Sequence, residues 1–211
     1  MQDRVTGIMM GCGFLASHLL SFITPHIDHL VFVDMEKIDQ VNYDNYIILK
    51  NYSNKKKVTA FSALAQMISP IATTPVHTRV RDTNHYMELI GQFNPDIVFV
   101  SFDNVRSRII ARDCAQMKGV QTIFMGATEN YCYVDWGESI ILPETEEEIQ
   151  RAEEQMSKIR DVCSRIEFRG LGAFTASAAY QAFITWRNTG EKLGFMINTE
   201  DNEVKVATLR R

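Results

Sequence analysis

The stretch that decides the fold is Val5-Thr6-Gly7-Ile8-Met9-Met10-Gly11-Cys12-Gly13-Phe14-Leu15-Ala16-Ser17-His18. It opens with a short apolar run and continues through a pair of glycines, after which apolar residues recur at helical spacing. A second apolar run begins at His29 and ends at Asp34. A strand, a glycine turn, a helix and a second strand in this order predict a βαβ unit with two parallel strands.

The rest of the chain continues to alternate between these two kinds of pattern. Apolar residues at helical spacing predict helices over residues 58–68, 84–93, 105–118, 144–166 and 170–188. Alternating or continuously apolar segments predict strands over residues 73–82, 96–101 and 120–126, and a hairpin within residues 194–209. The alternation predicts an α/β fold: a Rossmann-like, doubly wound, mainly parallel sheet with a C-terminal antiparallel hairpin.

Composition and charge exclude several classes of protein. The chain has 211 residues, of which 45% are hydrophobic and 23% are charged, so we expect a single folded domain over residues 1–211. Its net charge of −4 argues against nucleic-acid binding. It has no apolar run of about 20 residues and no signal-peptide core, so we expect a cytoplasmic protein without a membrane segment. Its four cysteines form no CxxC pair, so neither a structural zinc site nor a disulfide framework is expected.

Ligands of open α/β sheets bind beyond the carboxyl ends of the strands, so a site is expected in the loops that follow the strands. In the first loop, Gly11 permits a tight turn and Gly13 lets the backbone approach a phosphate at the start of a helix. Asp34 ends the next strand, where a carboxylate can accept hydrogen bonds from ribose hydroxyls. These two loops predict a nucleotide site, and they suit a nicotinamide or flavin cofactor as well as ATP.

A third loop, which follows the predicted strand over residues 96–101, favours ATP. Asp103 lies just beyond the strand tip, where a carboxylate can hold Mg²⁺ between phosphates, and an arginine about one helical turn later can fix its position. A dinucleotide cofactor has no labile phosphate and rarely needs a metal at this place. The loop therefore distinguishes the two kinds of nucleotide.

Taken together, the three loops resemble the ThiF/MoeB/HesA family of the ubiquitin-activating-enzyme-like superfamily. The GxGGxGS loop of that family is matched by residues 11–17. Its DxDxVxxxNLxRQ motif is matched without a gap by residues 34–46, and its DxxxxxxDNxxxR motif is matched by residues 96–108. The resemblance covers about residues 4–127 and, more weakly, residues 160–190.

The resemblance implies roles for individual residues in the second motif and after it. It places Asp34 on the ribose-binding acid and Asn42 on a phosphate-contacting asparagine. The family also has a phosphate-binding lysine ahead of a helix. Lys57 fits this lysine best, because the Ser-Pro pair that ends the helix follows at the distance seen in the family, and Lys55 and Lys56 stay open as alternatives.

The third motif places Asp103, Asn104 and Arg108 at the nucleotide. The family reaction binds Mg·ATP and adenylates the C-terminal glycine carboxylate of a ubiquitin-like or sulfur-carrier protein, which releases pyrophosphate. The resemblance implies that Lys57 and the glycine-loop amides neutralise phosphate oxygens and that Asp103 holds Mg²⁺. The nucleotide-binding half is then about residues 1–127, residues 128–211 supply the crossover, the C-terminal helices and the hairpin, and a homodimer or heterodimer is expected.

Several positions depart from the family pattern. Phe14 replaces the second glycine of the GG pair, and the two CxxC pairs that bind zinc in the family are missing. Asn45 stands at the position of the phosphate-binding arginine, and an uncharged amide cannot neutralise the leaving pyrophosphate. Lys50 or Lys55 could compensate, or another subunit or partner could supply the missing charge. The glycine loop begins at residue 11, so we expect this chain to lack the preceding helices that support the neighbouring site in dimeric members.

These departures leave two alternatives beside an active adenylating enzyme. One is a member of the same family that binds nucleotide or serves as a partner subunit with weak or no turnover. The other, less favoured, is an NAD-binding Rossmann protein, which the first two loops support and the third loop opposes.

A nucleophilic cysteine is the last candidate feature. Cys163 precedes Gly170 by seven residues and lies ahead of a small-residue helix, where many family members carry a cysteine that forms a thioester or persulfide. The neighbouring Arg160 and Arg165 would favour its thiolate. The other interpretation is an ordinary thiol near a helix end. Cys132 is a weaker candidate for the same role.

Overall fold

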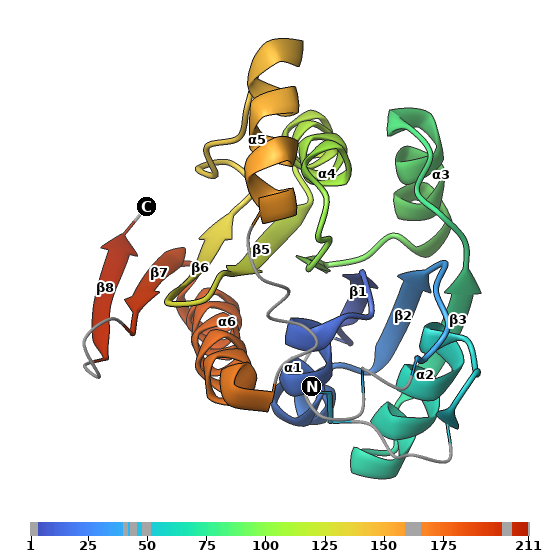
Figure 1. The fold of residues 1–211 in the computed structure, drawn as a ribbon. Helices are drawn as coiled ribbons and strands as arrows, with labels where there is room; N and C mark the ends of the chain where they lie inside the picture. Colours follow the sequence, from blue (N-terminus) through green and yellow to red (C-terminus); the bar gives the residue numbers. More distant parts are fainter. Residues whose placement is uncertain are drawn as a thin grey trace.

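The computed structural model describes residues 4–39, 42, 46–47, 52–158, 166–199 and 204–210. Within these residues one eight-stranded sheet has the strand order β3-β2-β1-β4-β5-β6-β7-β8 (Figure 1). The first five strands in this order are parallel, and β6, β7 and β8 continue the sheet antiparallel. The strands are β1 (Thr6–Met10), β2 (His29–Asp34), β3 (Ala72–His77), β4 (Ile97–Val100), β5 (Gln121–Ala127), β6 (Tyr131–Trp136), β7 (Leu193–Asn198) and β8 (Lys205–Arg210).

The helices of the described residues lie on both faces of this sheet. They are α1 (Phe14–Ile23), α2 (Lys57–Ile68), α3 (Thr83–Phe93), α4 (Val105–Lys118), α5 (Glu146–Lys158) and α6 (Arg169–Thr189), with short 3₁₀ helices η1 (Thr24–His26) and η5 (Ile166–Phe168). Helices α1, α2 and α6 pack on one face, α3 and α4 cover the other, and α5 packs on α4 (Figure 1). This is the doubly wound arrangement that the sequence predicts.

The central strands are buried on both faces, which explains their continuous apolar sequence. In β1, Met9 belongs to the hydrophobic core with α1 and α6, and Ile8 belongs to the core with α3 and α4. In β4, Phe99 and Val98 divide between the same two cores. Because neighbouring side chains on a strand point to opposite faces, each strand contributes to both cores and neither face tolerates polar residues.

The edge strand β3 is shorter than predicted. It ends at His77, and Asp82 begins α3 by accepting a hydrogen bond from the backbone N–H of His85 at 2.9 Å. Pro75 lies within β3, a position that proline tolerates because only one side of an edge strand is hydrogen-bonded to a neighbour.

The antiparallel part of the sheet contains one strand that the sequence analysis did not predict. The hairpin of β7 and β8 is confirmed, but β6 lies between it and the parallel strands. Its pattern was visible in the sequence: Cys132, Val134 and Trp136 face the core, and Tyr131, Tyr133 and Asp135 alternate with them. Within the hairpin turn, residues 200–203 lie outside the described residues.

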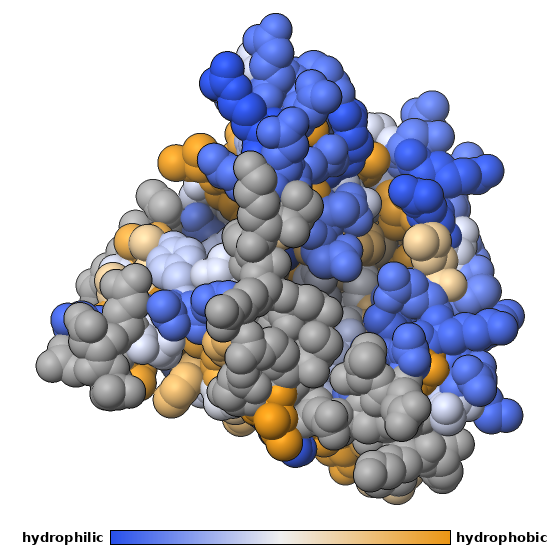
Figure 2. Space-filling model, in the orientation of Figure 1, coloured by the Kyte–Doolittle hydropathy of each residue, from blue (hydrophilic) through white to orange (hydrophobic). Residues whose placement is uncertain are grey.

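The helix predicted over residues 144–166 is seen as α5 over Glu146–Lys158, and residues 159–165 lie outside the described part of the chain. Figure 2 shows hydrophilic side chains over α5, as predicted for a solvated helix. Three glutamates in its first turn, Glu146, Glu147 and Glu148, suit the positive end of the helix dipole. No helix among the described residues is long and apolar enough to cross a membrane.

Close packing of α1 against α6 accommodates Phe14. Its side chain is buried, and its ring meets that of His18 edge to face at 5.2 Å. A Cβ atom built on Gly172 of α6 would lie 2.4 Å from Cζ of Phe14 and 2.9 Å from Cδ2 of His18. Gly172 therefore provides the space that the Phe14 ring occupies.

Replacing Gly172 with alanine is expected to lower the free energy of unfolding by about 1–3 kcal/mol, because the added methyl group overpacks the interface between α1 and α6. The matched control is Gly170→Ala in the same helix, where no atom lies within 4 Å of the added Cβ. That variant is expected to be as stable as the wild type or more stable by about 0.5–1 kcal/mol. Urea unfolding measures both, and equal midpoints for the two variants would contradict this account of the interface.

Candidate functional site

The glycine loop is held against the loop that follows β4. Gly11 has a φ of 91°, a left-handed conformation that favours glycine, and its N–H donates to the carbonyl oxygen of Val33 at 2.9 Å. The hydroxyl of Ser101 donates to the carbonyl oxygen of Gly11 at 2.8 Å. A Cβ on Gly11 would lie 3.2 Å from the backbone nitrogen of Phe102. The first and third predicted loops are therefore in direct contact.

The start of α1 has no capping side chain, because its N-cap residue is Gly13. In most helices a serine, threonine or aspartate at this position accepts a hydrogen bond from the N–H groups of the first turn. The Phe14 side chain points into the interface with α6 and not over the loop. The helix N-terminus is therefore suited to an anion such as a phosphate, as the glycine spacing predicts.

Asp34 lies at the end of β2 and links it to the glycine loop. Its Oδ2 accepts a hydrogen bond from the backbone N–H of Cys12, and its Oδ1 accepts one from that of Glu36, each at 2.7 Å. Burial raises the pKa of Asp34, and these two hydrogen bonds and the charge of Lys57 partly oppose that shift. Each carboxylate oxygen keeps a second lone pair, so the predicted role of Asp34 toward ribose hydroxyls is chemically compatible with its present contacts.

Lys57 provides a buried cation beside this loop. Its side chain is only 7% exposed, and its Nζ lies 2.5 Å from Oε2 of Glu36 and 3.4 Å from the hydroxyl of Tyr46. That hydroxyl is also the nearest atom to a Cβ built on Gly13, at 3.8 Å. Burial by itself lowers the pKa of Lys57, but Tyr46, Glu36 and Asp34 together raise it by more. The net effect is a raised pKa. A raised pKa keeps Lys57 protonated near neutral pH.

The structure distinguishes Lys57 from its neighbours. Lys55 and Lys56 are exposed, whereas Lys57 is buried next to the glycine loop. Asn42 is also buried, and its Oδ1 accepts a hydrogen bond from the N–H of Asp39 at 2.9 Å. Asn45 and Lys50 lie outside the described residues.

The loop after β4 presents Asp103 to solvent. Asp103 is exposed and makes no hydrogen bond or ion pair with the described residues. Asn104 caps α4, because its Oδ1 accepts a hydrogen bond from the N–H of Ser107 at 2.8 Å. The carboxylate of Asp103 is thus available to a ligand, while the backbone on either side of it is held.

Arg108 is buried beneath this loop and does not project into solvent beside Asp103. Its Nε donates to the carbonyl oxygen of Phe102 at 2.6 Å, one terminal nitrogen donates to the hydroxyl of Tyr133 at 2.7 Å, and the other donates to the carbonyl oxygen of Met125 at 2.6 Å. The whole residue is only 8% exposed. In this arrangement Arg108 fixes the Asp103 loop, and a direct contact with nucleotide stays a prediction.

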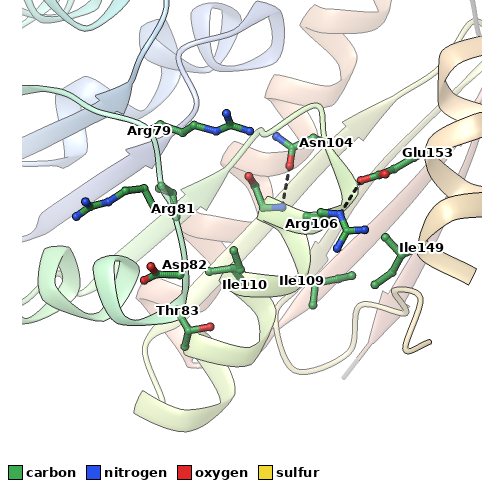
Figure 3. A pocket seen from close by; sticks show the side chains of 12 residues that line it. Arg79, Arg81, Asp82, Thr83, Asn104, Arg106, Ile109, Ile110, Ile149 and Glu153 are labelled. Atoms are coloured by element: carbon green, nitrogen blue, oxygen red, sulfur yellow. Dashed lines mark hydrogen bonds and ion pairs between the residues drawn. The ribbon is translucent and has the colours of Figure 1, made fainter. Parts of the chain in front are cut away.

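A cavity of about 720 Å³ begins at the start of α4 and extends between α3 and α5 (Figure 3). Val80, Ile109, Ile110 and Ile149 supply apolar side chains to its lining. Figure 3 shows Arg79 reaching toward Asn104, while Arg106 turns toward α5. There Arg106 forms ion pairs with Glu146 and Glu153. The cavity adds an apolar compartment with a charged rim to the polar loops described above.

The cysteines of the described residues are unsuited to nucleophilic chemistry. Cys12, Cys114 and Cys132 are buried, and burial raises the pKa of each thiol. Cys132 faces the core from β6, which argues against the weaker of the two cysteine candidates. Cys163, the stronger candidate, lies outside the described residues.

A sequence profile described as the ThiF family matches residues 4–181. This chain belongs to the ThiF family. The match extends beyond the three loops into α6, so it includes much of the second half of the chain, where the motifs alone carried little information. No protein in a search of curated sequences matches this member of the ThiF family.

Solved structures share the fold of this ThiF-family chain. E. coli MccB with AMPCPP and MccA has a TM-score of 0.78 and 13% sequence identity, with 99% of this chain and 64% of the MccB chain covered. E. coli MccB with ATP has a TM-score of 0.76 at 13% identity, with the same coverage of both chains. PaaA has a TM-score of 0.75 at 12% identity, with 99% of this chain and 73% of the PaaA chain covered. The chain therefore spans about two thirds of the length of these structures.

Three residues at the site escaped the sequence analysis. Glu36 and Tyr46 pair with Lys57, and Tyr133 binds Arg108. Glu36 and Tyr46 fall inside the second ThiF motif, so their position in the sequence could have identified them as candidate site residues. Tyr133 lies outside every motif, and nothing in the sequence connects it with Arg108.

Proposed function

We propose that this protein is an ATP-dependent adenylyltransferase that activates the C-terminal carboxylate of a ubiquitin-like or sulfur-carrier protein, or of a similar peptide. The observation that carries the proposal is the buried, charged Lys57 beside the glycine loop, within 3.4 Å of the Tyr46 hydroxyl that faces Gly13. A buried cation at this place suits the charge of a triphosphate, and it favours ATP over a dinucleotide cofactor.

Different residues of the site are proposed to bind different parts of the nucleotide. In the proposal the N–H groups at the start of α1 and Lys57 bind phosphate oxygens, and Asp34 accepts hydrogen bonds from the ribose. The cavity next to Asn104 receives the base, because apolar side chains such as Ile109 and Ile110 suit the faces of a purine ring.

The residues at the β4 tip fit Mg²⁺ that is bound together with a nucleotide. The described residues contain no group of three or more His, Cys, Asp or Glu side chains that could hold a metal by themselves. Mg²⁺ at nucleotide sites commonly takes one or two carboxylates, with phosphates and water as its other ligands. Asp103 offers one exposed carboxylate that has no hydrogen-bond or ion-pair partner among the described residues, and the metal would supply charge neutralisation between phosphate groups.

The reaction needs positioning and charge stabilisation more than proton transfer. A carboxylate oxygen of the acceptor attacks the α-phosphorus of ATP, the bond from that phosphorus to the bridging oxygen breaks, and pyrophosphate leaves with the bonding electron pair. Lys57 and the glycine-loop amides would stabilise the charge on the phosphate oxygens. The product is an acyl-adenylate, and in the proposal the Cys163 thiolate then attacks its acyl carbon, the bond from that carbon to the AMP oxygen breaks, and AMP leaves, which gives a thioester.

The solved structures of MccB support ATP as the nucleotide of the proposal. MccB has been solved with ATP and with MccA, and its fold covers nearly all of this chain. Since MccB is longer than the described chain, the acceptor of this protein is part of the proposal and does not follow from the fold. Asn45 supports the second candidate, a family member that binds ATP or a partner subunit without turnover.

The test combines nucleotide binding with ATP–pyrophosphate exchange. Titrations with ATP and Mg²⁺ are expected to show binding, and titrations with NAD are not. Exchange is expected when a small ubiquitin-like or sulfur-carrier protein ending in Gly-Gly is added as the acceptor. ATP binding without exchange would favour the inactive family member, and tight NAD binding without ATP binding would overturn the assignment to ATP.

A further inference from the structure

We propose that Tyr133 is a positioning residue for Asp103. Its hydroxyl holds Arg108, and Arg108 in turn holds the backbone directly before Asp103. The consequence for Mg²⁺-dependent binding rests on the proposed function, whereas the consequence for the order of the loop does not.

The contacts form a continuous chain from β6 to the loop after β4. The Tyr133 hydroxyl accepts a hydrogen bond from Arg108 at 2.7 Å, and Nε of Arg108 donates to the carbonyl oxygen of Phe102 at 2.6 Å. The remaining terminal nitrogen of Arg108 donates to the carbonyl oxygen of Met125 in β5 at 2.6 Å. Hydrogen bonds from a charged donor are stronger than neutral ones, so the guanidinium is held firmly on three sides.

The ring of Tyr133 is itself fixed by the sheet. Tyr133 pairs with Gly126 across β5 and β6, and a Cβ built on Gly126 would lie 2.3 Å from Cε1 of the ring. The ring therefore rests directly on the backbone of β5, in space that only glycine leaves open. The guanidinium carbon of Arg108 also lies 5.8 Å from the ring centre, within the range of a cation–π contact.

The loop depends on these contacts because its own polar groups hold only its two ends. Ser101 is tied to Gly11 at one end, and Asn104 caps α4 at the other. Between them Asp103 is exposed and makes no hydrogen bond or ion pair with the described residues. Arg108, supported by Tyr133, thus holds the carbonyl of Phe102 and thereby fixes the orientation of Asp103, the next residue.

The first test compares ATP binding with Mg²⁺ and with EDTA by calorimetry in the wild type, Tyr133→Phe and Tyr131→Phe. Tyr133→Phe keeps the ring and removes only the hydroxyl, and it is expected to weaken Mg²⁺-dependent ATP binding about tenfold while leaving metal-free binding unchanged. Tyr131→Phe is the matched control on the same strand and is expected to bind as the wild type does. An unchanged ratio of the two affinities in Tyr133→Phe would overturn the positioning role, since a merely structural residue would not alter that ratio.

The second test uses amide hydrogen exchange without nucleotide, so it holds even if the protein does not bind ATP. Tyr133→Phe is expected to speed exchange at residues 102–105 relative to the wild type and Tyr131→Phe, because the support of the Phe102 carbonyl is weakened. Equal exchange in all three proteins would refute the inference. Failure of the wild type to bind ATP, with faster exchange in Tyr133→Phe, would instead count against the proposed function alone.

Discussion

Replacing Asp103 with alanine is expected to weaken Mg²⁺-dependent ATP binding by at least about 100-fold, since changes in the groups that merely support a metal ligand already cost about 10- to 100-fold. Asp103 is the exposed carboxylate at the tip of β4, and it has no partner within the described residues that its loss would disturb. The effect should therefore appear in metal-dependent binding and not in the free energy of unfolding. Calorimetric titration with Mg·ATP and urea unfolding measure the two quantities.

Asp113→Ala is the matched control for this change. Asp113 is an acid on the same helix that follows the loop, and it forms its ion pair with Arg112, away from the nucleotide loops. We expect this variant to bind Mg·ATP as the wild type does. If Asp103→Ala binds as tightly as Asp113→Ala, the assignment of the metal to the β4 tip is wrong.

Replacing Lys57 with methionine is expected to lower the rate of ATP–pyrophosphate exchange by about 100-fold or more, as the loss of one preorganised group at a developing charge does in other enzymes. Methionine keeps much of the volume of the buried side chain and removes its charge. Because the pKa of Lys57 is raised, the wild-type residue stays protonated, and no part of the effect is expected to depend on pH near neutrality. The rate is measured with saturating acceptor.

Lys56→Met is the control, because Lys56 is the exposed neighbour that the sequence analysis left open as an alternative to Lys57. It is expected to keep the full exchange rate. Loss of activity in Lys56→Met with full activity in Lys57→Met would move the phosphate-binding role to the exposed lysine. Loss in both would indicate that the positive charge of the whole segment matters, and it would contradict the specific role of the buried cation.

Much of the first half of the chain could be predicted because its signals are local. The turn at Gly11 and the helix start at Gly13 follow from which backbone conformations glycine allows, and Asp34 and Asp103 are placed at strand ends by the alternation of apolar runs. Local signals did not exclude Lys55 and Lys56 as alternatives to Lys57. Burial separated Lys57 from its neighbours, and burial depends on how α2 packs against the rest of the chain.

By itself, the sequence determined the doubly wound fold and the likeness to the ThiF family. It also placed the three motif loops at the carboxyl ends of the strands. These features follow from periodicity and motif spacing, which are properties of the chain read in order. Only the tertiary structure decided that Arg108 supports the Asp103 loop from behind, that Tyr133 holds Arg108, and that Gly172 makes room for Phe14. These pairs join residues far apart in the chain, and their contacts exist only after the strands and helices have packed. No local pattern specifies which distant side chain will lie within hydrogen-bonding distance.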